Sequence, residues 1–186
     1  MTFVICLGSR HDRIANYSIE KFGDYVAEMP ENRIIVAAYS EEDVIRHRIA
    51  PEIDYLISQK TGKKLLYAGS GAYDLEKERQ KVLSSGGDDP DFVTKKNIME
   101  MMDTTIWTYL SSFWTDPAKV NSNETDSIFS ARKLMRTSFV PEIETDLWVP
   151  FMNRTVDNVK HIDNFQEAII LCDPESMFYL KQKIEK

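Results

Sequence analysis

Two arginines stand one helical turn apart near the middle of the second half of the chain. Arg132 and Arg136 belong to the stretch Ser130-Ala131-Arg132-Lys133-Leu134-Met135-Arg136, which has the composition of a helix. Guanidinium groups bind phosphate through paired hydrogen bonds, so two of them one turn apart can close on a phosphoryl group. The same spacing is also typical of an ordinary surface helix. The pattern alone leaves both interpretations open.

A second candidate site follows the first apolar run of the chain. The turn contains Gly8, Ser9, Arg10 and Arg13, and helical spacing begins directly after it. Backbone N–H groups and arginines at the start of a helix favour an anion. The turn has one glycine and no lysine, whereas a phosphate-binding loop has the pattern G-x-x-x-x-G-K-[ST]. A charged turn that caps a helix is the alternative interpretation.

Carboxylates supply the remaining candidates. Asp173 follows the last apolar run, where the carboxyl end of a strand would place it. Asp88, Asp89 and Asp91 could ligate a hard cation, but after two glycines and before a helix they are more simply a turn with an N-cap. The three histidines show no zinc-site spacing, so we predict no metal site built by the protein alone.

Strand and helix signals alternate at both ends of the chain. Continuous apolar runs closed by turn residues predict buried strands at 3–7, 33–38 and 168–172. Apolar residues at helical spacing predict helices at 14–29, from Ser40 onward, and from Pro174 to the end. This alternation is typical of an α/β chain with a mainly parallel sheet in three layers. Such sheets bind ligands at the carboxyl ends of their strands.

The middle of the chain is predicted to be helical, as an insertion or lid near residues 60–125 within one domain of residues 1–186. The glycine-rich stretch 61–72, the break 84–91 and the polar stretch 115–126 are predicted as loops. Helices are predicted at 73–83, 92–113, 130–138 and 142–152.

Composition limits the class of protein. Of 186 residues, 30 are acidic and 23 basic, which gives a net charge of −7 and argues against a nucleic-acid-binding surface. Cys6 and Cys172 lie in apolar runs and are predicted to be buried thiols. No apolar run approaches the roughly 20 residues that cross a bilayer, and the first residues lack the pattern of a signal peptide. We therefore expect a cytoplasmic protein that does not act in a membrane.

The order of these elements resembles the deoxynucleoside monophosphate kinases of tailed bacteriophages, which have the P-loop kinase fold. The similarity spans nearly the whole chain and rests on short motifs. They are Val4–Leu7, Ala37-Ala38-Tyr39-Ser40, Arg132-Lys133-Leu134-Met135, Asp146-Leu147-Trp148 and Ile169-Ile170-Leu171-Cys172-Asp173.

The resemblance implies transfer of a phosphoryl group from ATP, with Mg²⁺, to a (deoxy)nucleoside monophosphate. Gly8, Ser9, Arg10 and Arg13 would then hold the donor phosphates, Arg132 and Arg136 would clamp the transferred charge, and Asp173 would orient the metal ion or its water. If the protein is viral, the resemblance places it in the host cytoplasm.

The chain departs from the kinase pattern at its most important points. The Walker glycines and lysine are missing around Arg10, and Asp173-Pro174-Glu175 stands where the family has Asp-x-Arg. Because phosphoryl transfer depends on positioning and charge stabilisation, catalysis could be lost or remodelled. The alternative is therefore a non-catalytic protein that binds or inhibits another protein, such as a viral factor directed at the host. A glycosyl- or deoxyribosyl-transferring enzyme that uses Asp88, Asp89, Glu41 or Glu42 is a third possibility.

Overall fold

A small parallel sheet organises the protein. The computed structural model describes residues 3–6, 19–29, 34–42 and 58–184. Within them, four strands lie in the order β1-β4-β2-β3, and every neighbouring pair is parallel. Their bounds are Phe3–Cys6 for β1, Ile35–Ala37 for β2, Leu65–Tyr67 for β3 and Ile169–Cys172 for β4. The predicted α/β class with a parallel sheet is confirmed.

Helices make up most of the described chain. They are α1 (Ile19–Ala27), α4 (Ala72–Ser85), α5 (Pro90–Phe113), α6 (Pro117–Val120), α7 (Asn123–Phe139), α8 (Val149–Lys160) and α9 (Pro174–Ile184), with the π-helical segment η2 (Glu142–Trp148) before α8 and the 3₁₀ turn η3 (Phe165–Glu167) before β4. No helix among these described residues is long and apolar enough to cross a membrane.

The hydrophobic core surrounds β4 and α9. All four residues of β4 are buried, because this strand has a neighbour on each side. Helix α9 follows directly and buries Met177, Phe178 and Leu180 against the same core. Cys172 is buried as predicted, whereas nothing is described for the side chain of Cys6.

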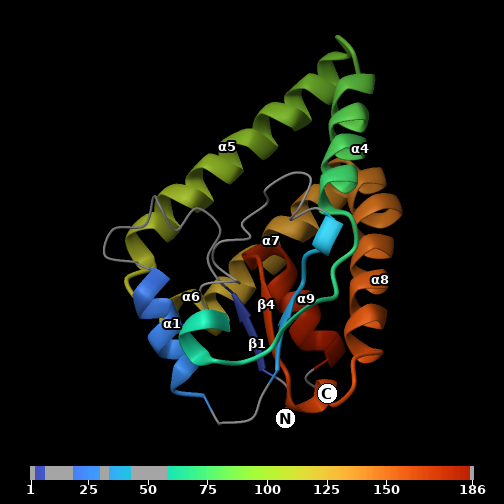
Figure 1. The fold of residues 1–186 in the computed structure, drawn as a ribbon. Helices are drawn as coiled ribbons and strands as arrows, with labels where there is room; N and C mark the ends of the chain where they lie inside the picture. The colour runs from blue at the N-terminus through green and yellow to red at the C-terminus, as the bar shows by residue number, and fades with distance from the viewer. Residues whose placement is uncertain (1–2, 7–18, 30–33, 43–57, 185–186) are drawn as a thin grey trace.

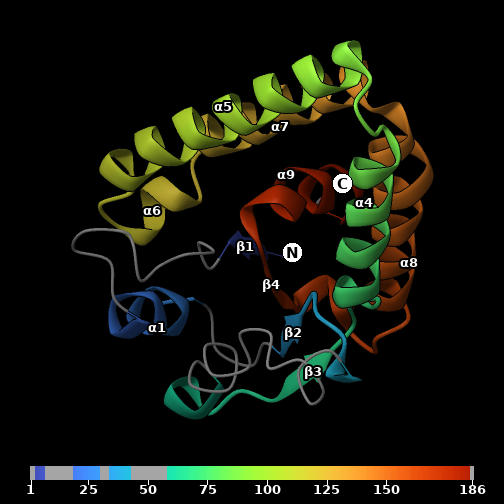
Figure 2. The same ribbon diagram turned by 90° about the horizontal axis from the view of Figure 1, so that it is seen from above.

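The long helices α5 and α7 run alongside each other, and α4 lies beside α8 (Figures 1 and 2). Residues of α4, α5, α7 and the start of α9 line a cavity at the end of β4. The sharp connection between α4 and α5 depends on Gly86, because a Cβ atom there would lie 2.2 Å from the Phe92 ring. Asp89 then caps α5 by accepting a hydrogen bond from the backbone N–H of Asp91, and Pro90 occupies the first turn.

Two predicted loops were wrong. The stretch 61–72 contains β3, whose residue Ala68 donates a backbone hydrogen bond to Ala37 at the end of β2. The stretch 115–126 contains α6 and the first turn of α7, which begins at Asn123 rather than near Ser130. In both places, polar residues and glycines indicated a loop, but tertiary pairing and N-capping decided the structure.

Candidate functional site

A cavity of about 1130 Å³ lies between α4, α5, α7 and the first turn of α9. It opens at the carboxyl end of β4, the edge at which open parallel sheets bind ligands. Its wall carries arginines and carboxylates on one side and indole rings and hydroxyl groups on another, including Arg79, Arg132, Arg136, Asp103, Glu175 and Trp107. Its volume lies just above the range of about 300–1,000 Å³ that is typical of small-molecule sites.

Helix α7 positions two of the arginines. Ser122 caps the helix by accepting a hydrogen bond from the backbone N–H of Thr125. From there, Thr125, Phe129 and Arg132 are buried at spacings of four and three residues, so they share one face. Arg136, four residues further, continues this face. The helix therefore presents both predicted arginines to the cavity.

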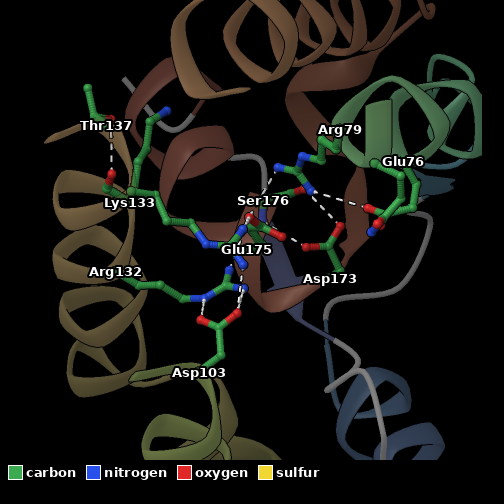
Figure 3. Close-up of polar contacts among 11 residues, drawn as sticks. Glu76, Arg79, Asp103, Arg132, Lys133, Thr137, Asp173, Glu175 and Ser176 are labelled. Atoms are coloured by element: carbon green, nitrogen blue, oxygen red, sulfur yellow. Dashed lines mark hydrogen bonds and ion pairs between the residues drawn. The ribbon is translucent and has the colours of Figure 1, made fainter. Parts of the chain in front are cut away.

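Asp103 on α5 binds both of these arginines (Figure 3). Its Oδ1 accepts from Nε of Arg132 at 2.7 Å, and its Oδ2 accepts from Nη2 of Arg132 at 2.9 Å and from Nη2 of Arg136 at 2.6 Å. Burial raises the pKa of Asp103, but the two arginines outweigh this effect and the pKa lies below its ordinary value. Asp103 therefore stays ionised and fixes the direction of both guanidinium groups.

The first turn of α9 contributes the two carboxylates at the end of β4. Asp173 caps the helix, because its oxygens accept from the backbone N–H and the hydroxyl of Ser176 at 2.9 and 2.8 Å. Burial, together with the nearby charge of Glu175, raises the pKa of Asp173. Glu175, two residues later, lies in the same turn and also lines the cavity.

Glu175 lies at the centre of an arginine cluster formed by Arg79, Arg132 and Arg136 (Figure 3). Its Oε1 lies 3.2 Å from Nη2 of Arg79, 3.1 Å from Nη1 of Arg132 and 3.4 Å from Nη1 of Arg136. Burial raises the pKa of Glu175, but the three arginines outweigh this and lower it. Through these contacts with Oε1 of Glu175, the arginine cluster links α4 and α7 to α9.

A further carboxyl group lies behind the arginine cluster. Glu144 comes from η2, is 2% exposed, and its Oε1 has no hydrogen-bond partner among the described residues. Burial and the charge of Glu175 raise the pKa of Glu144. The Nζ atom of Lys133 lies 3.4 Å from the centroid of the Trp148 ring, and burial lowers the pKa of Lys133.

Another part of the cavity lining is aromatic and hydroxylated. Trp107 is half-buried and packs edge-on against Trp114 and Phe129, with ring centroids 5.8 and 5.9 Å apart. Thr104 and Thr108 flank it on α5 and also line the cavity. Trp107 lies one turn along the helix from Asp103, so a ring surface and the arginine cluster border the same space.

The protein has no match among known families. No family model, curated protein or solved structure matches the chain.

The structure brings part of the predicted site together. Arg132, Arg136 and Asp173 line one cavity, whereas Gly8, Ser9, Arg10 and Arg13 lie outside the described residues. Sequence reasoning missed Arg79 and Asp103, which lie on helices full of other charged residues. Glu175 stands where the kinase pattern has an arginine, and in the structure it binds the three arginines.

No group of three or more possible metal-ligating side chains occurs in the described part of the chain. A magnesium ion bound with a nucleotide takes most of its ligands from phosphates and water, and needs one or two protein carboxylates at most. Asp173 is the carboxylate at the cavity edge that fits such a role, although Ser176 already occupies both of its oxygens.

Proposed function

We propose that the protein binds a phosphorylated nucleotide in the cavity and acts as a phosphotransferase of the nucleoside monophosphate kinase type. The observation that carries this proposal is the convergence of Arg79, Arg132 and Arg136 at the carboxyl end of β4, on the wall of a cavity of about 1130 Å³. Arginine forks are the side chains best suited to hold a phosphate in a fixed orientation.

The rest of the cavity suits a nucleoside. Aromatic rings stack on nucleobases of any kind, and Trp107 offers such a ring one helical turn from Asp103, which binds Arg132 and Arg136. Thr104 and Thr108 place hydroxyl groups beside it. A ligand with a planar base at one end and a phosphate at the other therefore matches both ends of the cavity.

The second substrate would be ATP, bound near the residues that follow β1 in the sequence. Strands β1 and β4 are parallel neighbours with Cys6 opposite Cys172, so the chain leaves both strands at the same edge of the sheet. Gly8, Ser9, Arg10 and Arg13 follow β1 in sequence and are the proposed donor-phosphate residues. In the reaction, an oxygen of the monophosphate forms a bond to the γ-phosphorus of ATP, and ADP leaves with the bridging oxygen.

Each described residue has a separate part in this proposal. Arg132 and Arg136 would stabilise the charge on the transferred group, and Asp103 would keep them aligned. Asp173 would hold Mg²⁺ or a water bound to it. Mg²⁺ would supply charge neutralisation between the phosphates.

A thermal-shift panel with ATP, GTP and the four deoxynucleoside monophosphates, each with and without Mg²⁺, tests binding. A ligand at a hundred times its dissociation constant stabilises the folded state by about 2.7 kcal/mol. We expect one monophosphate and one triphosphate to raise the melting temperature. ADP release from that pair then tests transfer.

The matched variants are Arg136→Gln in the cavity and Arg154→Gln on the exposed face of α8. We expect the first to lose the monophosphate shift and the second to keep it. A panel without any shift would refute the proposal.

The alternative is a protein that binds another protein. The charges of the arginine cluster are already balanced in part by Asp103 and Glu175, as in a purely structural ion network. Met101 on α5 and Leu134 on α7 are 65% and 68% exposed. A flat nucleotide panel, together with a stable complex recovered with a partner protein, would favour this function.

A further inference from the structure

The two carboxylates that share the arginine cluster bind it in different ways. Asp103 makes three contacts of 2.6 to 2.9 Å and spreads them over both of its oxygens. These distances are those of strong charge-assisted hydrogen bonds, which lie at about 2.7–2.9 Å. Asp103 is therefore a well-fitted counter-ion of Arg132 and Arg136.

Glu175 fits the arginine cluster poorly. Its contacts with Arg79, Arg132 and Arg136 are 3.1 to 3.4 Å long, and all three go to the single atom Oε1. A carboxylate oxygen has two lone pairs, so it cannot accept from three donors along a favourable direction at once. The three guanidinium groups surround a space that one oxygen does not fill well.

The arginine cluster also has hydrogen-bonding capacity to spare. Nε of Arg79 is buried and has no hydrogen-bond partner among the described residues. Arg132 and Arg136 share the carboxylates of Asp103 and Glu175, whose pKa values are both lowered. Arg79 contacts Glu175 at 3.2 Å and Glu76 only at 3.9 Å.

We propose that Arg79, Arg132 and Arg136 form a three-armed site for a terminal phosphate group, and that Glu175 occupies this site until a ligand displaces its carboxylate. A tetrahedral phosphate offers one oxygen to each guanidinium group, which the single Oε1 of Glu175 cannot do. The proposal rests on the proposed function in one respect, namely that the ligand of the cavity is phosphorylated.

The position of Glu175 allows this exchange. Its side chain is 27% exposed and lines the cavity, so it can turn into the open space. The helix that carries it stays in place, because Asp173 caps α9 and Met177 and Leu180 anchor it in the core. Displacement therefore costs side-chain contacts only and leaves the fold unchanged.

This arrangement makes Glu175 a competitor of the ligand. Removing its charge should strengthen the binding of a free phosphate, whereas removing a binding residue should weaken it. We expect Glu175→Gln to bind inorganic phosphate and pyrophosphate about tenfold more tightly than the wild-type protein, which corresponds to about 1.4 kcal/mol.

The test measures dissociation constants of phosphate and pyrophosphate by titration calorimetry at constant ionic strength. Glu142→Gln, an exposed position outside the cavity wall, is the charge-matched control and should bind as the wild type does. Tighter binding by Glu175→Gln alone supports the proposal. Equal or weaker binding by this variant, or no phosphate binding by any of the three proteins, overturns it.

A second variant protects the test against a folding defect. Glu175→Ala removes the carboxylate without adding an amide among the guanidinium groups, and it too should bind phosphate more tightly. The nucleotide panel separates this proposal from the proposed function. If the wild type binds a nucleotide while both variants bind phosphate no better than it does, the displacement by phosphate is wrong and the nucleotide site stands.

Discussion

Helix α9 and the hairpin of α4 and α5 differ sharply in how they are held. Seven residues of α9 are buried, from Pro174 to Ile184, whereas α5 buries only Met99 and Leu110 over a much longer span and α4 buries none of its described residues. The hairpin is attached through the ion pairs of Arg79 and Asp103, through Leu110 in the main core, and through a small cluster of Met99, Val140 and Ile143. We infer that β4 and α9 stabilise the fold, while the hairpin forms a wall of the cavity.

The largest expected effect tests the α9 side of this comparison. Leu180→Ala removes a fully buried side chain from the core and should lower the free energy of unfolding by about 2–5 kcal/mol. Urea denaturation measures this value. Met101→Ala on the exposed face of α5 is the control and should change stability by no more than about 0.5 kcal/mol. Similar losses in both variants would show that the hairpin is as tightly integrated as α9.

A smaller loss of stability is expected from a change at Asp103, which attaches the hairpin to α7. Asp103→Asn leaves Arg132 and Arg136 without their charged partner and should cost about 1–3 kcal/mol at neutral pH. It should also weaken monophosphate binding, because the two arginines lose their fixed direction. Unchanged binding after a measurable loss of stability would mean that Asp103 only holds the helices together.

The pH dependence of this variant has a definite sign. The pKa of Asp103 in the folded protein lies below its ordinary value of 3.8. Its stabilisation is therefore present above pH 3.8 and is lost as the pH falls through the lower folded value. We expect the difference in unfolding free energy between wild type and Asp103→Asn to be constant near neutral pH and to shrink below about pH 4. A difference that grows on acidification would contradict this.

The smallest expected loss of stability comes from a hydrogen bond between the end of α5 and the start of α7. Nε1 of Trp114 donates to Oγ1 of the buried Thr125 at 2.9 Å, and this hydroxyl donates to the carbonyl of Lys119 at 3.0 Å. Thr125→Val preserves the shape and leaves the buried indole N–H without this acceptor, which should cost about 1 kcal/mol. Thermal denaturation measures it, and Thr125→Ser, which keeps the hydroxyl, should retain most of the stability.

The sequence predicted the fold correctly where the apolar pattern extended over enough residues to identify a strand or a helix. The runs that became β2 and β4, and the helices α5 and α9, had clear patterns. Strand β3 has only Leu65, Leu66 and Tyr67, and Ala68 and Gly69 follow it, so its pairing with β2 could not be read locally. The start of α7 could have been predicted from the sequence. Ser122 is a good N-cap residue, and Glu124 and Asp126 supply negative charge in the first turn, which together signal the start of a helix.

The residues of the candidate site also divide into those that the sequence revealed and those that it did not. The spacing of Arg132 and Arg136 is local, and the sequence revealed it. Their partners are not local, since Asp103 lies 29 residues before Arg132 and Arg79 lies 96 residues before Glu175. No pattern distinguishes Arg79 from the other charged residues of α4. The π-helical turn that buries Glu144 also has no known local signature in this sequence.

The most direct test of the account compares a nucleotide with its own nucleoside. Titration calorimetry of the wild-type protein should show that the deoxynucleoside monophosphate selected in the thermal panel binds at least about a hundredfold more tightly than the matching deoxynucleoside, a difference of about 2.7 kcal/mol. This result would place the phosphate at the centre of recognition. Equal affinities, or no binding of either molecule, would contradict the assignment of the arginine cluster as a phosphate site.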